Sequence, residues 1–180
     1  MPYPANVLPA KLRRWKTPFL VFDREVLRKK AAEFTGFRPK IETFYSVKAN
    51  SSPTLLEYLA DLKLGFEVSS KEELRRVLAI RRSTSNVSTS NPIKPPEFID
   101  YAYRNGIDEF VVDSVEEIYK IASIAPGSKI IVRLLVDNTE SAWPLDKKYG
   151  VSTEEAIKLL VLCQGKGLRP LGLTFHVGSQ

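Results

Sequence analysis

The chain has 180 residues, a formal net charge of +6 and 43% hydrophobic residues. This composition excludes a disordered or fibrous protein and allows one domain with a substantial buried core. The single Cys163 cannot form an internal disulfide, and no apolar run is long enough to span a bilayer. We therefore expect a cytoplasmic protein that does not enter a membrane.

The basic residues do not indicate a nucleic-acid partner. Short basic clusters occur in 11–16 and 75–82, but acidic residues interrupt the rest and no nucleic-acid-binding motif is present. We interpret these clusters as solvated surface and residues 1–16 as an N-terminal arm. Residues 17–22 are mostly apolar and predict a strand, and a helix is expected from about Arg24 to Thr35.

Beyond residue 40, short apolar strands alternate with helical segments. Most strand centres are about 22 residues apart, the length that one strand, one loop and one helix require. This alternation predicts βα units with a parallel sheet, and an open doubly wound sheet is the alternative. A loop at 137–150 lengthens the last interval. We place the strand centres at Phe44, Phe66, Val87, Val111, Arg133 and Thr174.

Local signals mark where the intervening helices begin. Proline is tolerated in a first helical turn, and a serine side chain can accept a hydrogen bond from an unpaired amide there. Where glutamate follows three residues after the serine, the pair predicts a capping box. These signals are Pro53, Ser70, Pro95 and Pro96, and Ser114 with Glu117; a further helix is expected at 153–163.

Lys48 lies at the end of the first of these strands. Parallel barrels and sheets place their chemistry at the carboxyl ends of strands, and a lysine amine there can form a Schiff base with a carbonyl. Far downstream, His176 follows the last expected strand and is the only histidine of the chain. The pattern favours a pyridoxal phosphate enzyme.

Taken together, the motifs resemble the fold-type III pyridoxal phosphate decarboxylases, which include ornithine, lysine, diaminopimelate and arginine decarboxylases. The resemblance extends over almost the whole chain after about Thr17. It rests on several segments that occur in the same order. They are Tyr45-Ser46-Val47-Lys48-Ala49-Asn50, Gly65-Phe66-Glu67-Val68-Ser69-Ser70, Asn91-Pro92-Ile93-Lys94, Trp143-Pro144-Leu145 with Lys147-Lys148-Tyr149-Gly150, and Phe175-His176-Val177-Gly178-Ser179-Gln180.

The resemblance implies roles for the residues of the first and last motifs. Lys48 forms the Schiff base with pyridoxal 5'-phosphate, and His176 stacks on the cofactor ring. Gly178 lets the backbone approach closely, and Ser179 donates its hydroxyl to a phosphate oxygen. Without the flanking motif, His176 would be interpreted as a strand-end histidine bonded to backbone.

Other residues are expected near the cofactor on the same grounds. Glu67 lies beside the lysine and favours the protonated Schiff base. Arg133 carries its charge to the end of an apolar strand, toward the cofactor or into an internal ion pair. Glu73 matches an acid near the cofactor, but a glutamate that complements the dipole at the start of its helix is an equal alternative. Lys148 matches a lysine in a loop beside the site, for which a solvated surface lysine is the stronger interpretation.

The implied fold is a (β/α)₈ TIM-type barrel of the alanine racemase kind, of which residues 24–180 supply about six βα units. Residues 17–23 are then a strand of a second sheet domain that is otherwise absent. Eight strands close such a barrel, and the family's pyridine-nitrogen acid, Gly-rich phosphate loop and cross-dimer residues do not occur in this sequence. We expect a homodimer for a full-length relative and little activity from this chain alone.

The activity implied is the decarboxylation of a basic amino acid through Lys48, with ornithine to putrescine, in polyamine biosynthesis, as the first choice. Lysine or diaminopimelate as substrate is an alternative. Another alternative is a non-catalytic, decarboxylase-like regulator that binds a decarboxylase subunit. A racemase or small cofactor-carrier protein of the same barrel type also carries Lys-Ala-Asn, but the Glu-Val-Ser-Ser segment favours the decarboxylases. No metal is expected.

Overall fold

The computed structural model describes residues 12–36, 41–81, 84–137, 140–142 and 148–178. Six short strands alternate with helices, as the spacing predicted, and all the strand pairs are parallel. The strands are β1 (Phe44–Ser46), β2 (Gly65–Glu67), β3 (Val87–Ser88), β4 (Glu109–Val112), β5 (Lys129–Arg133) and β6 (Arg169–Thr174).

The helices begin where the local signals place them. Ser70 accepts the Glu73 amide at 3.2 Å, and Pro53 occupies the first turn of its helix. A complete capping box joins Ser152 and Glu155 and was not among the predicted signals. The helices are α1 (Arg24–Thr35), α2 (Pro53–Asp61), α3 (Lys71–Arg81), α4 (Pro96–Arg104), α5 (Val115–Ile124) and α6 (Thr153–Gly165), with short 3₁₀ turns η2 (Leu12–Arg14) and η3 (Val47–Ala49).

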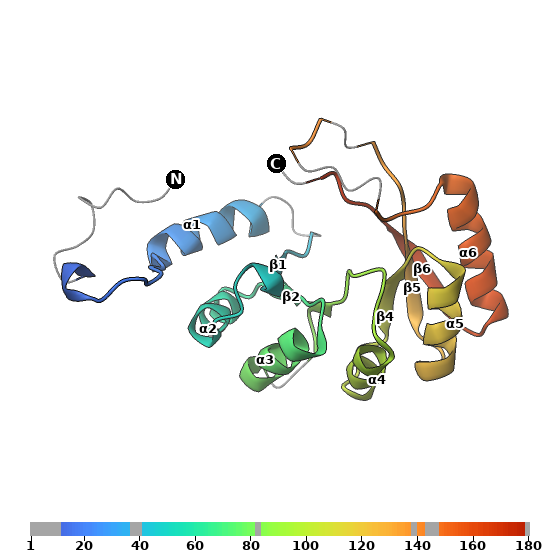
Figure 1. Cartoon of the computed structure of the whole chain (residues 1–180), viewed down its shortest axis with the longest axis horizontal. Coiled ribbons are helices and arrows are strands. Elements are labelled where there is room, and N and C mark those ends of the chain that lie inside the picture. Colours follow the sequence, from blue (N-terminus) through green and yellow to red (C-terminus); the bar gives the residue numbers. More distant parts are fainter. Residues whose placement is uncertain (1–11, 37–40, 82–83, 138–139, 143–147, 179–180) are drawn as a thin grey trace.

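The helices α2 to α6 follow an arc on one side of the strands (Figure 1). Apolar side chains from the strands and helices form the core between these layers. A doubly wound sheet would have helices on both faces, so this arrangement is the N-terminal part of a TIM-type barrel. Fully buried core residues include Phe66, Phe98, Phe110, Ile118 and Ile130.

The strands form two sheets of three instead of one sheet of six. The order is β1-β2-β3 in one and β4-β5-β6 in the other, and no strand ladder joins β3 to β4 among the described residues. β3 has two residues, which leaves little backbone for pairing with a strand on each side. We call the junction between β3 and β4 the seam.

The strand expected at 17–22 is not present in the structure. These residues form neither helix nor strand, and the apolar side chains of Leu20, Val21 and Phe22 are exposed. A strand exists through hydrogen bonds to a neighbour, and no described segment pairs with this one. Its place in a second sheet domain stays a prediction.

The outer ends of the arc expose apolar surface. Beside β1, an apolar groove of about 390 Å³ lies between α1 and the first sheet and is lined by Leu27, Phe34 and Phe44 among others. At the other end, Leu171 and Leu173 of β6 are about half exposed. Both edge strands therefore lack the cover that a closed barrel would provide.

Candidate active site at the carboxyl ends of the strands

Lys48 lies in the 3₁₀ turn η3, which directly follows β1. Val47, which precedes it, is fully buried, and the Tyr45 hydroxyl donates a hydrogen bond to the Asn50 carbonyl oxygen at 3.1 Å. Burial raises the pKa of Tyr45, so this hydroxyl keeps its proton at neutral pH. The turn that carries Lys48 is thus fixed on both sides, while the Lys48 side chain is exposed.

Glu67 ends β2 and accepts hydrogen bonds from three serine hydroxyls. Ser46 donates to Oε2 at 2.5 Å, and Ser69 and Ser90 donate to Oε1 at 3.0 and 2.7 Å. The donors come from the end of β1, the turn after β2 and the segment after β3. We call these four residues the serine–glutamate cluster. It holds both carboxylate oxygens in place on the strand next to the one that leads into Lys48.

Sequence reasoning identified Glu67 but missed its serine partners. Each serine lies at or just beyond a strand end, and parallel strands bring such residues to one edge of a sheet. That placement was the available signal. Glu73, in contrast, accepts the Ser69 amide at 2.8 Å, so its carboxylate takes the helix-start position that was one of its two predicted roles. Its predicted place near a cofactor stays a prediction.

Arg133 is the last residue of β5 and lies half-buried, as expected of a charge carried to a strand end. Its guanidinium carbon is 5.0 Å from the centroid of the Tyr149 ring. Burial lowers the pKa of Arg133, and the negative charge of Asp113 opposes that effect. Asp113, just after β4, also accepts the Gly150 amide at 3.0 Å, so it ties the end of the 137–150 loop to the strand ends.

His176 follows β6 and is exposed. Its Nδ1 accepts a hydrogen bond from the Gly178 amide at 2.8 Å, so the proton of the neutral ring is on Nε2. Partial burial, then Arg133 and then Lys48, lower the pKa of His176. The lowered pKa favours the neutral imidazole.

The carboxyl ends of the strands thus carry an amine, a guanidinium and an imidazole, together with a carboxylate that three serines hold in place. Lys48 and Glu67 come from the first sheet, and Arg133 and His176 from the second. The positive charge of Arg133 suits an anionic ligand, and the exposed amine of Lys48 suits a carbonyl. This donor set fits a phosphate-bearing aldehyde such as pyridoxal phosphate.

Several predicted residues add less to this geometry. Ser179 and the Trp143-Pro144-Leu145 motif with Lys147 lie outside the described residues. Lys148 is exposed, as a solvated loop lysine would be. Gly178 has a φ of +84°, a backbone conformation that favours glycine. Among the described residues, no group of histidine, cysteine and acidic side chains could hold a metal ion.

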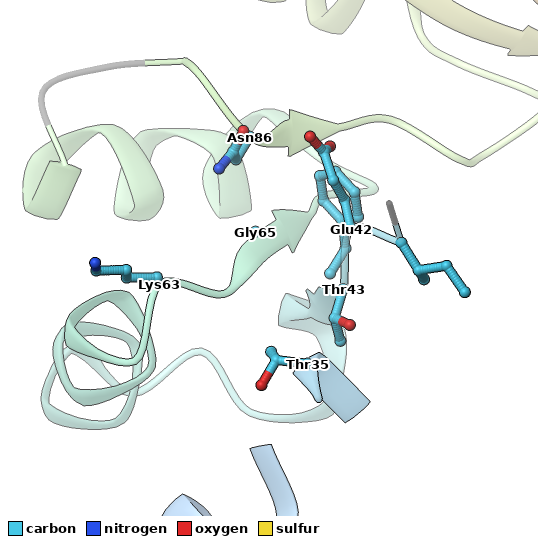
Figure 2. A pocket seen from close by; sticks show the side chains of 8 residues that line it. Thr35, Glu42, Thr43, Lys63, Gly65 and Asn86 are labelled. Atoms are coloured by element: carbon cyan, nitrogen blue, oxygen red, sulfur yellow. The ribbon is translucent and has the colours of Figure 1, made fainter. Parts of the chain in front are cut away.

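The opposite, amino-terminal ends of β1 and β2 border a smaller cavity of about 170 Å³ (Figure 2). Glu42, Thr43, Lys63 and Asn86 contribute to its lining. Figure 2 shows the Lys63 side chain extending away from Glu42, so these charges do not converge. The carboxyl ends of the strands therefore carry the candidate site.

In the described part of the chain, every helix is too short or too polar to cross a membrane.

The chain matches the family described as "Pyridoxal-dependent decarboxylase, pyridoxal binding domain" over residues 24–180. Ornithine decarboxylase 2 of Drosophila melanogaster is 35% identical to it over 160 residues, which cover 88% of this chain and 41% of the fly protein. The chain thus spans less than half the length of this relative.

Solved structures agree with this similarity. The lysine decarboxylase of Selenomonas ruminantium aligns with a TM-score of 0.85 and 33% identity, over 96% of this chain and 47% of that one. The arginine decarboxylase of Paramecium bursaria Chlorella virus aligns with a TM-score of 0.82 and 28% identity, over 87% and 42%. The named substrates of these relatives differ, but all are basic amino acids.

Proposed function

Because the chain belongs to the pyridoxal-dependent decarboxylase family, we propose that it supplies the cofactor-binding part of an enzyme that decarboxylates a basic amino acid. The observation that carries this proposal is the position of Lys48. Its exposed amine follows β1 at the carboxyl end of the strand, and His176 follows the carboxyl end of β6. The chain thus brings a nucleophilic amine and a flat neutral ring to one end of the barrel.

The described residues fit the cofactor in distinct ways. Lys48 would hold it covalently, and His176 would offer the face of its neutral ring. Arg133 contributes a positive charge opposite to that of the phosphate. When bound, pyridoxal phosphate supplies an electron sink for the electron pair released as the substrate carboxylate leaves as carbon dioxide.

The other residues of the site keep these groups in place. The three hydroxyls of the serine–glutamate cluster hold the Glu67 carboxylate in one orientation at the end of β2, the strand paired with β1. Nζ of Lys48 is the atom that would take up or release a proton as a substrate amine binds. Asp113 holds the end of the 137–150 loop near Arg133.

We propose ornithine as the substrate, with putrescine as the product and polyamine biosynthesis as the process. Similarity to the fly ornithine decarboxylase supports this choice. Lysine, diaminopimelate and arginine are the alternatives to test. A cytoplasmic location and a homodimer of the full-length protein belong to the same proposal.

The decisive experiment tests Lys48 as the cofactor attachment point. Pyridoxal phosphate is added to the purified chain, the visible spectrum is recorded, and borohydride is used to fix any adduct before peptide mass analysis. We expect a Schiff-base band and a reduced adduct on Lys48, and neither in Lys48→Ala. Lys63→Ala, which removes an exposed lysine at the opposite end of β2, is the matched control and should leave both signals unchanged.

If no lysine-specific adduct forms in the native chain, the proposal for this chain fails and a binding role becomes the better hypothesis. If the adduct forms, decarboxylation of ornithine, lysine, diaminopimelate and arginine is compared by release of carbon dioxide from full-length protein. Ornithine should then show the highest kcat/KM. A higher value for another amino acid would overturn the substrate assignment but leave the cofactor site intact.

A further inference from the structure

The seam between the two sheets is bridged by side chains instead of a strand ladder. Thr89 donates its hydroxyl to the Glu109 carbonyl oxygen at 2.9 Å, near the start of β4. Lys94 donates to the Val111 carbonyl oxygen at 2.6 Å, near the end of β4. Lys94 thus joins the segment after β3 to the strand end from which Asp113 follows.

Lys94 is completely buried, which is rare for lysine and requires partners for its charge. Its ammonium also donates to the carbonyl oxygens of Asn91 at 3.0 Å and Pro92 at 3.3 Å. The same ammonium forms an ion pair with Glu117 Oε1 at 2.9 Å. One side chain therefore contacts the segment after β3, the end of β4 and helix α5.

The backbone of Lys94 is held by the same helix. Its amide donates to Glu117 Oε1 at 3.1 Å, and Lys120 donates to its carbonyl oxygen at 2.7 Å. Lys120 also pairs with Glu117 Oε2 at 2.6 Å. Glu117 and Lys120 thus clamp residue 94 from α5, and both oxygens of the buried carboxylate are occupied.

The groups of the candidate site are divided between the two sides of this seam. Lys48 and the serine–glutamate cluster belong to the first sheet, and Ser90 of that cluster directly precedes Asn91. Arg133 and His176 belong to the second sheet, together with Asp113, which lies two residues beyond Val111. Lys94 thus binds backbone one residue from Ser90 on one side of the seam and two residues from Asp113 on the other.

We propose that Lys94 is a positioning residue that aligns the Lys48 side of the site with the Arg133 and His176 side. This inference rests on the proposed cofactor site for its consequence. Packing alone does not require a charge here, because apolar residues of similar volume often replace a buried ion pair with no loss of stability. What an apolar side chain cannot do is donate to the carbonyl oxygens on both sides of the seam.

The test separates positioning from stability. Lys94→Met leaves Glu117 buried with one partner fewer and should lower both stability and cofactor affinity. Lys94→Met combined with Glu117→Leu removes both charges and should recover most of the urea midpoint. If Lys94 positions the site, the cofactor Kd of this double variant stays about tenfold or more above that of the native chain. Arg104→Met, which breaks an exposed ion pair with Asp100, is the control. It should change neither the urea midpoint nor the cofactor Kd.

A second measurement does not depend on the cofactor. Spin labels at Glu57→Cys on α2 and Lys158→Cys on α6 report the distance across the seam, because both positions are exposed and Cys163 is buried. We expect a single narrow distance distribution in the native background and a broader or displaced one in the double variant. An unchanged distribution, or a cofactor affinity that returns with stability, would overturn the positioning role.

The two proposals fail in different ways. A native chain that forms no Lys48 adduct refutes the cofactor site, whereas the spin-label distances still decide whether Lys94 aligns the sheets. A native chain that forms the adduct, together with a double variant that binds the cofactor equally well, refutes the role of Lys94 alone.

Discussion

The buried ammonium of Lys94 should make the stability of the chain depend on pH in a direction opposite to that of an ordinary ion pair. Burial lowers the pKa of Lys94 from 10.5 to about 8, outweighing the opposing attraction of Glu117. Lys120 adds to the lowering, and Asp113 opposes it. Between pH 8 and 10.5 the unfolded chain therefore binds more protons at this lysine than the folded chain does.

Stability rises with pH wherever the unfolded state binds more protons. A difference of about 2.5 pKa units at about 1.4 kcal/mol each corresponds to roughly 3 kcal/mol. The cost of burying the charge is full below pH 8 and is relieved as the pH approaches 10.5. The Lys94→Met variant has no titrating group at this position. Relative to it, the free energy of unfolding of the native chain should rise by about 2 to 3 kcal/mol between pH 7 and pH 10.

The assay is urea unfolding of both proteins at several pH values, followed by far-ultraviolet circular dichroism. Burial raises the pKa of the Cys163 thiol to about 11, which makes stability fall between pH 9 and 11. That effect is present in both proteins and cancels in their difference. A difference that falls as the pH rises would show that the attraction of Glu117 outweighs burial, and a flat difference would show that the two effects balance. Either result would refute the reasoning.

Two further predictions concern the site. In urea titrations, Gly150→Ala should lower the free energy of unfolding by at least 1 kcal/mol more than Gly127→Ala does. Both glycines have a positive φ, but only a Cβ at position 150 would lie 2.8 Å from the backbone of Leu134. An equal loss would show that φ alone matters. Replacing any one serine of the serine–glutamate cluster by alanine should cost about 0.5–1.5 kcal/mol in the same assay. Ser128→Ala, which removes a buried hydroxyl without a partner among the described residues, should not lower stability, and a comparable loss there would contradict the role of the cluster.

The helices show how far local signals determine structure. The predicted helix from about Arg24 to Thr35 and the start at Pro53 are confirmed, because a cap or a proline acts on amides of its own first turn. The strand expected at 17–22 is the exception. Its apolar pattern is local, but a strand also needs a partner segment, and the described part of the chain offers it none.

Glu117 marks the limit of such local reasoning. Its amide bonds Ser114 Oγ at 3.3 Å, as a capping box requires, but its carboxylate pairs with Lys94 and Lys120. The predicted box is therefore only half formed. The ammonium groups of Lys94 and Lys120 are charged donors, so they bind the carboxylate more strongly than the neutral Ser114 amide would.

The amino-acid sequence by itself determined the alternation of strands and helices, the placement of Lys48, Arg133 and His176 at or just beyond strand ends, and the family resemblance. Only the tertiary structure decided that three serines hold Glu67, that the strands divide into two sheets, and that Lys94 bridges them. The physical reason is the distance along the chain over which each interaction acts. Caps and periodicity act within a few residues, whereas Ser46, Ser90 and Lys94 lie 21 to 23 residues from the carboxylates they bind. Strand pairing in the first sheet brings the two serines to Glu67, and packing across the seam brings Lys94 to Glu117.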